Sequence, residues 1–288
     1  MIQFATAQTT QSIRSMWKTC FGDSDQYMDL IFSRKYKEED TLVYFEEGVA
    51  VASLQLQPYT MQLYGEAVQL YYLMGLCTLP EYRGRGYMAQ LIVESIKVVK
   101  LRGVFLTVLV PAENWLYGYY AKYGYVKTFD EDPTPIDLEL IAHTYSRDVL
   151  EAYKLFDMKF QHKESTVLKT QDDFDVMLTE YTMDNLPRKS NLGGMSHFVN
   201  PLPVLRAYAK ANPHFDFTFS LAHSALDKSA NYHVHRGVVD VVSTTHVDFE
   251  INIQQLTSLL LGYNVDQFPA HIGGYFEPKH PSLNLMLE

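Results

Sequence analysis

Four consecutive residues combine positive charge with backbone freedom: Arg83, Gly84, Arg85 and Gly86. They follow an apolar run typical of a strand and precede a run with apolar residues at helical spacing. A helix N-terminus presents unpaired N–H groups, glycine lets an anion approach the backbone closely, and arginine binds phosphate through two hydrogen bonds. The turn therefore predicts an anion-binding site at the start of a helix. The alternative is an ordinary surface turn that contains arginines, which would have the same sequence pattern.

The elements around this turn predict a first domain over residues 1–143. We expect a helix at 11–22, two strands within 41–59 that turn at Glu47-Gly48, and a strand that Pro80 ends. A helix after the turn, a buried strand at 103–110, a short aromatic helix at 114–125 and strands at 125–129 and 135–141 follow. This mixed order is typical of an α+β fold, with a mixed central sheet and flanking helices.

The rest of the chain predicts a connector and a second domain. Residues 144–195 contain two amphipathic helices, at 146–158 and 170–181, and a linker at 184–194. The second helix opens with Thr170 and Asp173, which form a capping-box pattern. From residue 196 to 288 the pattern changes to alternating strands at 215–224 and 247–253 with helices at 201–210 and 254–263. This part predicts a smaller α+β domain whose sheet has one face exposed to solvent.

The segment YYLMGLCTLPEYRGRGYMAQLIVESI resembles motif A of the GNAT acetyltransferases, in which Gln/Arg-x-x-Gly-x-Gly/Ala follows a strand. In that family the amides of the turn hold the pyrophosphate of acetyl-CoA, and the preceding strand pairs with the pantetheine arm. The resemblance implies two sets of coenzyme-binding residues: Leu76, Cys77 and Thr78 along the pantetheine, and Arg83, Gly84, Arg85, Gly86, Tyr87 and Met88 around the pyrophosphate. Met88 departs from the small residue of the family and would crowd the approach of the coenzyme.

A second segment, VLVPAENWLYGYYAKYGYV, resembles motif B of the same family. The resemblance implies that Asn114 hydrogen-bonds near the pantetheine or caps the helix. It also puts Tyr120 at the position of the tyrosine that lies near the coenzyme sulfur and protonates the leaving thiolate. The alternative is that the tyrosines of this segment only pack, which we accept for Tyr117, Tyr119 and Tyr123.

Acetyl transfer by direct attack also needs a base for the amine, and many members of the family place a glutamate on the strand before the turn. That strand here has no carboxylate. Cys77 is a lesser candidate for a covalent nucleophile, because a cysteine inside an apolar strand pattern is more often a packing residue. The strand amide near Leu76 or Cys77 would polarise the thioester carbonyl.

The whole chain resembles the Eis-type acetyltransferases, whose last domain is similar to sterol carrier protein. The segments FDFTFSLAHSALDKSANYHVHRG and VDFEINIQQLTSLLLGY carry this second likeness. In that family the C-terminal carboxylate enters the acetyltransferase site, so the resemblance implies that the α-carboxylate of Glu288 is the base; the alternative is a frayed terminus. The chain departs from the family in having only about 50 residues in place of a second GNAT-like middle domain.

Composition limits the partners of the protein. The chain has 24 Lys and Arg against 34 Asp and Glu among 288 residues, which argues against general nucleic-acid binding. Two cysteines give no disulfide framework, and no signal peptide or membrane-length apolar run is visible. These features predict a cytoplasmic protein without membrane association; a homo-oligomer is compatible with them.

Two further clusters carry no firm function. His233 and His235 share one face of an expected strand, but spacing offers no third ligand, so we expect no metal site. The acidic runs at 37–40 and 130–133 would attract a cation, although solvated loops are the more common case.

Together these features predict an acetyl-CoA-dependent N-acetyltransferase that acts on a small or polycationic amine. Tyr120 would be the general acid. The alternative is a non-catalytic protein that binds CoA or a lipid in an apolar cavity of its C-terminal domain. Loss of turnover in Tyr120→Phe would separate the two.

Overall fold

The computed structural model describes residues 1–130, 148–183, 192–222 and 229–283. The strands are β1 Ile2–Phe4, β2 Thr41–Glu46, β3 Val49–Leu63, β4 Glu66–Thr78, β5 Leu106–Leu109, β6 Val126–Lys127, β7 Thr166–Leu168, β8 Met195–Phe198, β9 Asp216–Ala222, β10 Ala230–His235, β11 Val238–Val242 and β12 Phe249–Asn252. The helices are α1 Ala7–Phe21, α2 Asp25–Arg34, α3 Tyr87–Leu101, α4 Trp115–Ala121, α6 Val149–Phe160, α7 Gln171–Tyr181, α8 Pro201–Ala211, α9 Ile253–Leu261 and α10 Ala270–Gly273. The predicted strand at 135–141, most of the predicted linker and Glu288 lie outside the described residues.

The first sheet has the strand order β1-β2-β3-β4-β5-β8-β6, and β7 pairs with β3 beside this path. All pairs are antiparallel except β4 and β5. The predicted turn at Glu47 and Gly48 joins β2 to β3, and both residues have positive φ. The mixed α+β fold predicted for this part of the chain is confirmed.

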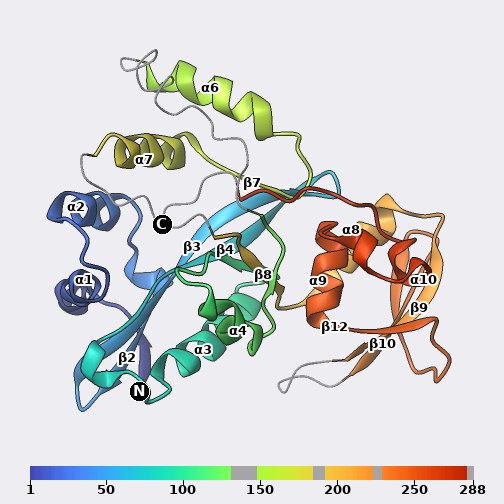
Figure 1. Ribbon diagram of the computed structural model, residues 1–288, viewed down its shortest axis with the longest axis horizontal. Coiled ribbons are helices and arrows are strands. Elements are labelled where there is room, and N and C mark those ends of the chain that lie inside the picture. The colour runs from blue at the N-terminus through green and yellow to red at the C-terminus, as the bar shows by residue number, and fades with distance from the viewer. Residues whose placement is uncertain (131–147, 184–191, 223–228, 284–288) are drawn as a thin grey trace.

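Helices cover both faces of this sheet (Figure 1). Alternate residues of β3 enter two different apolar cores, since side chains of a strand point to opposite faces. Leu54 and Leu56 pack in the core that α3 closes, while Tyr59 and Met61 pack in the core that contains α1 and α2. The Arg-Gly turn therefore leads into the helix on one face, and α1 and α2 lie on the other.

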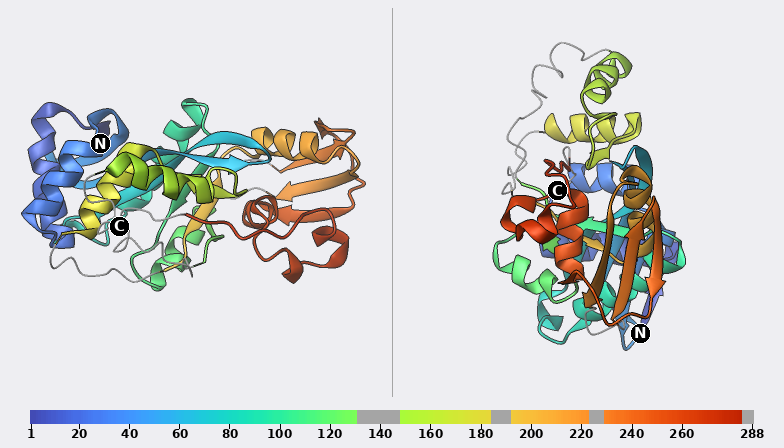
Figure 2. Two further views of the ribbon diagram at one scale, coloured as in Figure 1. Left: turned by 90° about the horizontal axis from the view of Figure 1, so that it is seen from above. Right: turned by 90° about the vertical axis from the view of Figure 1, so that its right-hand side faces the viewer.

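A second sheet, with the order β11-β10-β9-β12, lies beside the first (Figures 1 and 2). Phe217, Phe219 and Leu221 of β9 are buried and their neighbours are less so, as the alternation predicts. Helices α8 and α9 match the predicted helices at 201–210 and 254–263. α9 begins with a capping box between Asn252 and Gln255.

Two strands that follow residue 143 belong to the first sheet. Strand β8 spans residue 196, where we placed the start of the second domain, and it lies between β5 and β6 of the first sheet. Strand β7, within the predicted connector, also pairs with the first sheet. The division into 1–143, 144–195 and 196–288 stays a prediction.

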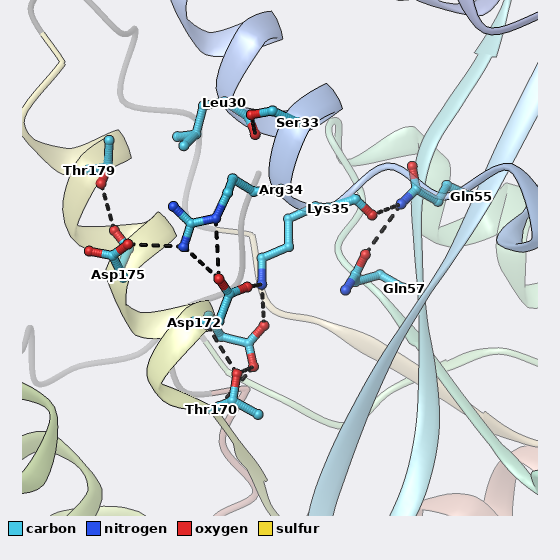
Figure 3. A network of polar contacts seen from close by, with 11 residues as sticks. Leu30, Ser33, Arg34, Lys35, Gln55, Gln57, Thr170, Asp172, Asp175 and Thr179 are labelled. Atoms are coloured by element: carbon cyan, nitrogen blue, oxygen red, sulfur yellow. Dashed lines mark hydrogen bonds and ion pairs between the residues drawn. The ribbon is translucent and has the colours of Figure 1, made fainter. Parts of the chain in front are cut away.

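A charged network joins α2 to α7 (Figure 3). Arg34 at the end of α2 pairs with Asp172 and Asp175, with N–O distances of 2.5 and 3.0 Å. The Lys35 side chain is only 4% exposed, and its Nζ lies 2.8 Å from Asp172 and 2.7 Å from Asp173. A buried ammonium requires such partners, because an unpaired one would be costly to desolvate. The network therefore fixes α7 against the face of the sheet that carries α2.

Lys169 gives this part of the fold a pH-dependent stability. Burial lowers the pKa of Lys169 from 10.5 to about 7. Between these two values the unfolded chain binds more protons than the folded one, so the free energy of unfolding should rise with pH. We expect Lys169→Met to stabilise the protein by about 1–3 kcal/mol near pH 7. Urea denaturation from about pH 7 to about pH 9 should show this advantage shrinking; an advantage constant with pH would contradict the prediction.

Candidate active site

A bulge bends β4 just before the Arg-Gly turn. On β3, Ser53 pairs with Cys77 and Gln55 pairs with Met74, so Leu54 alone lies opposite both Gly75 and Leu76. Gly75 has φ +59, and a Cβ atom on it would lie 1.9 Å from Cζ2 of Trp17. Only glycine fits here, since both the left-handed backbone and the indole exclude a side chain.

The ladder between β4 and β5 is short. It contains Tyr71 paired with Thr107 and Tyr72 paired with Val108, while β4 continues to Thr78. Residues 73–78 of β4, which include the bulge, therefore extend past its paired section with β5. Leu76 is half-buried there and packs on the α3 core, and Cys77 points to the opposite core.

The turn after β4 ends in an open helix N-terminus. Gly84 and Gly86 have φ values of +77 and +79, and a Cβ on either would meet no atom within 4 Å. Gly86 is the N-cap of α3, and no side-chain capping hydrogen bond is made at this position within the described part of the chain. The first N–H groups of a helix have no acceptor within it. The turn thus presents the backbone geometry expected of an anion site, with Tyr87 buried and Met88 half-buried at its base.

Both arginines of the turn have protein partners. Nε of Arg83 donates to the carbonyl of Thr78 at 3.1 Å. Arg85 lies 3.1 Å from Glu46 and donates to the carbonyl of Glu81 at 3.2 Å. The Arg85 side chain is half exposed, so its ion pair is weak and exchangeable. Both arginines thus already make hydrogen bonds within the protein, whereas a Cβ built on Gly84 or Gly86 would meet no atom within 4 Å among the described residues.

Tyr120 differs from the other tyrosines around α4. It is 7% exposed and belongs to the same apolar core that Leu76 packs against. Tyr117 donates to the carbonyl of Gly193, and Tyr119 bonds with Tyr123, but no hydrogen bond of the Tyr120 hydroxyl occurs within the described residues. Burial raises the pKa of Tyr120 to about 12, so its phenol is protonated at neutral pH.

Asn114 precedes α4, and its side chain makes no capping hydrogen bond. The sequence left two roles open for Asn114, and the prediction that it caps α4 is wrong. The side chain is exposed. Its predicted contact with the pantetheine stays a prediction.

The buried Cys77 forms a hydrogen bond with the half-buried Cys20 of α1, a contact that we did not predict. Cys77 lies 3.2 Å from the hydroxyl of Ser53, and burial raises the pKa of its thiol well above 9. Cys20 donates to the carbonyl of Thr78 at 3.4 Å, and its hydrogen bond with Cys77 is the main cause of a pKa lowered to about 7. A protonated, buried Cys77 is a packing residue, as the more common alternative in the sequence implied.

The two histidines that share one face of β10 have separate acidic partners. His233 and His235 stack at 4.2 Å and bond separately to Asp216 and Asp240. No group of three or more His, Cys, Asp or Glu side chains that could hold a metal occurs among the described residues. Within the same residues, no helix has the length and apolar character needed to span a bilayer.

Comparison with known proteins agrees with this geometry. Residues 1–127 match a family model described as an acetyltransferase (GNAT) domain. A GCN5-related N-acetyltransferase from Anabaena variabilis is 13% identical, with a TM-score of 0.70 over 99% of each chain. A probable N-acyltransferase from Enterococcus faecalis is 14% identical, with a TM-score of 0.69 over 97% of each chain. Eis1 from Mycobacterium abscessus is 12% identical, with a TM-score of 0.64 over the whole of both chains.

At these identities the crystal structures establish likeness of fold alone, and no curated protein sequence matches the chain. The family match covers residues 1–127 of this chain. Its N-terminal part is a GNAT acetyltransferase domain, as the two motifs predicted, and enzymes of this kind take their acetyl group from acetyl-CoA. The likeness of the C-terminal part to sterol carrier protein stays a prediction.

Proposed function

We propose that this protein transfers the acetyl group of acetyl-CoA to a primary amine of a small or polycationic acceptor. The observation that carries the proposal is the uncapped N-terminus of α3 with Gly86 in the left-handed conformation, directly after the bulged end of β4. Backbone N–H groups at such a terminus bind phosphate. The pyrophosphate would lie at residues 83–88, and the pantetheine would follow Leu76, Cys77 and Thr78 towards the bulge.

In this arrangement the amine nitrogen attacks the thioester carbonyl carbon and the C–S bond breaks. The amide of Leu76 is our candidate for the group that stabilises the negative charge on the carbonyl oxygen, because a bulge frees one residue from the ladder. The departing thiolate takes a proton from the Tyr120 hydroxyl, and the proton lost by the attacking amine restores that phenol. An amine that arrives protonated must first lose one further proton; the terminal carboxylate of Glu288 remains the predicted acceptor of it.

Tyr120→Phe should lower kcat about 100-fold and leave the Kd for acetyl-CoA within about twofold of the wild-type value. The reason is that the phenol acts on the leaving group and makes no contact that holds the coenzyme. Release of free thiol in the presence of an amine measures kcat, and calorimetric titration with acetyl-CoA measures Kd.

Tyr119→Phe is the matched control, since Tyr119 is the preceding residue on α4 and its hydroxyl bonds to Tyr123. It should keep kcat within about threefold. Because the pKa of Tyr120 is about 12, loss of its proton should not reduce the rate at any pH below about 10. Equal rates for the wild-type protein and Tyr120→Phe would contradict the assignment of Tyr120 as the general acid. A wild-type protein that does not bind acetyl-CoA would contradict the proposed function.

A further inference from the structure

Gln55 of β3 has a buried oxygen without a donor. The residue is 1% exposed. Its Nε2 donates to the carbonyl of Lys35 at 2.7 Å and to Oε1 of Gln57 at 3.2 Å. No hydrogen-bond partner of Gln55 Oε1 occurs among the described residues. Figure 3 shows Nε2 turned towards Lys35 and Gln57, with Oε1 on the other side of the amide.

The orientation of this amide is fixed by its neighbours. The carbonyl of Lys35 can only accept a hydrogen bond, so rotating the Gln55 amide by 180° would bring two oxygens together. A buried carbonyl oxygen that lacks a donor costs about 1–3 kcal/mol. Among the described residues this acceptor is therefore held in place at a cost, which a donor other than those residues, such as a bound ligand, would remove.

The position of Gln55 in the sheet links this oxygen to the proposed reaction. Gln55 pairs with Met74, the residue of β4 that directly precedes Gly75 and Leu76 of the bulge. Its side chain also lies on the α1 and α2 face of the sheet, because it bonds to Lys35 at the end of α2. The Arg-Gly turn leads instead into α3, on the opposite face of the sheet. A molecule that contacts Gln55 would approach the bulge from the face opposite to α3.

The charged groups nearby are matched to one another. Arg34 and Lys35 pair with Asp172, Asp173 and Asp175, and the buried Lys169 also interacts with the charge of Asp173. These cations are therefore compensated by carboxylates, and among these described residues the acceptor oxygen of Gln55 is the polar atom left for a ligand that carries an N–H donor.

We infer that Gln55 binds the acetyl acceptor, with Oε1 accepting a hydrogen bond from the amine nitrogen that attacks the thioester. This inference rests on the proposed function. A neutral primary amine has two N–H bonds and one lone pair, so it can donate one hydrogen to Gln55 while the lone pair points at the carbonyl carbon. Gln55 thereby selects acceptors whose attacking atom is also a hydrogen-bond donor.

The test compares Gln55→Met with Gln57→Met as the control. Gln57 lies two residues further along β3, on the same face of the sheet, and receives the same replacement. Ethanolamine, spermidine and kanamycin serve as probe amines in a thiol-release assay, and calorimetry gives the Kd for acetyl-CoA. We expect Gln55→Met to raise KM for the amine about 10-fold, close to the upper value of a hydrogen bond between uncharged groups, with kcat and the coenzyme Kd within about threefold. Gln57→Met should leave all three quantities within about threefold.

An unchanged KM in Gln55→Met would overturn the inference and leave ordered water as the partner of this oxygen. A wild-type protein that binds acetyl-CoA but acetylates none of the three amines would also overturn it. A wild-type protein that fails to bind acetyl-CoA would overturn the proposed function and the inference with it. If Gln55→Met does not fold, Gln55→Asn retains the amide but withdraws its oxygen by about 1.5 Å, and it should still raise KM.

Discussion

Gly86→Asp is expected to weaken acetyl-CoA binding roughly 100-fold or more while the protein stays folded. Asp is a favoured N-cap residue and tolerates the left-handed region better than most side chains. Its Cβ would meet no atom within 4 Å. The new carboxylate would cap the free amides of α3 itself and repel the pyrophosphate that we assign to them. Calorimetric titration with acetyl-CoA measures the loss, and circular dichroism checks the fold.

Gly103→Asp is the matched control for this experiment. Gly103 follows the other end of α3, has φ +74, and likewise has no atom within 4 Å of a built Cβ. The two variants therefore introduce the same residue with the same backbone strain at opposite ends of one helix. Gly103→Asp should bind acetyl-CoA as the wild type does. If both variants bind the coenzyme normally, the phosphate site does not lie at the turn.

Gly75→Ala is expected to lower the free energy of unfolding by about 2–4 kcal/mol. The added methyl group must displace the indole of Trp17, which is 3% exposed and donates to Ser53 at 3.3 Å. The substitution also forces a residue with a Cβ into positive φ. Urea denaturation gives the free energy, and titration with acetyl-CoA shows whether the bulge still positions β4 for the coenzyme.

The clash and the backbone strain can be measured separately. Gly103→Ala, which has positive φ and open space, should cost only about 1 kcal/mol. In a Trp17→Leu background, Gly75→Ala should lose at least about 1 kcal/mol of its effect, because the smaller side chain removes the contact. Equal costs with and without Trp17 would assign the whole effect to backbone strain.

Local patterns predicted much of this molecule because they report on neighbouring residues. The turn at Glu47 and Gly48, the capping box of Thr170 with Asp173 and the alternation along β9 all occur as the sequence implies. The conformation of the Arg-Gly turn was predictable for the same reason, since the glycines, the strand end and the helix start lie within one short segment. A resemblance to known motifs then supplied the chemistry.

The parts that the sequence did not predict depend on contacts between distant segments. In the sequence, Gly75 is a single glycine within an apolar strand. The need for glycine at this position becomes visible only in the structure, where Trp17 packs against it. A glycine inside a strand is a recognised sign of a bulge, so this signal could have been used. Gln55 and Lys35 join β3 to α2, and Cys20 joins α1 to β4. No spacing along the chain shows that such residues meet.

The position of β8 has a consequence for how the protein is made. Among the described strands, β6 at residues 126 and 127 pairs only with β8 at residues 195–198, which in turn pairs with β5. A ribosome must therefore synthesise about 70 more residues after β6 before that edge of the sheet can close. Until then the buried edge of β5 is an unpaired template for other chains, which is a hazard for aggregation. The acetyltransferase domain thus reaches its finished sheet late in synthesis, and its early half depends on the later one.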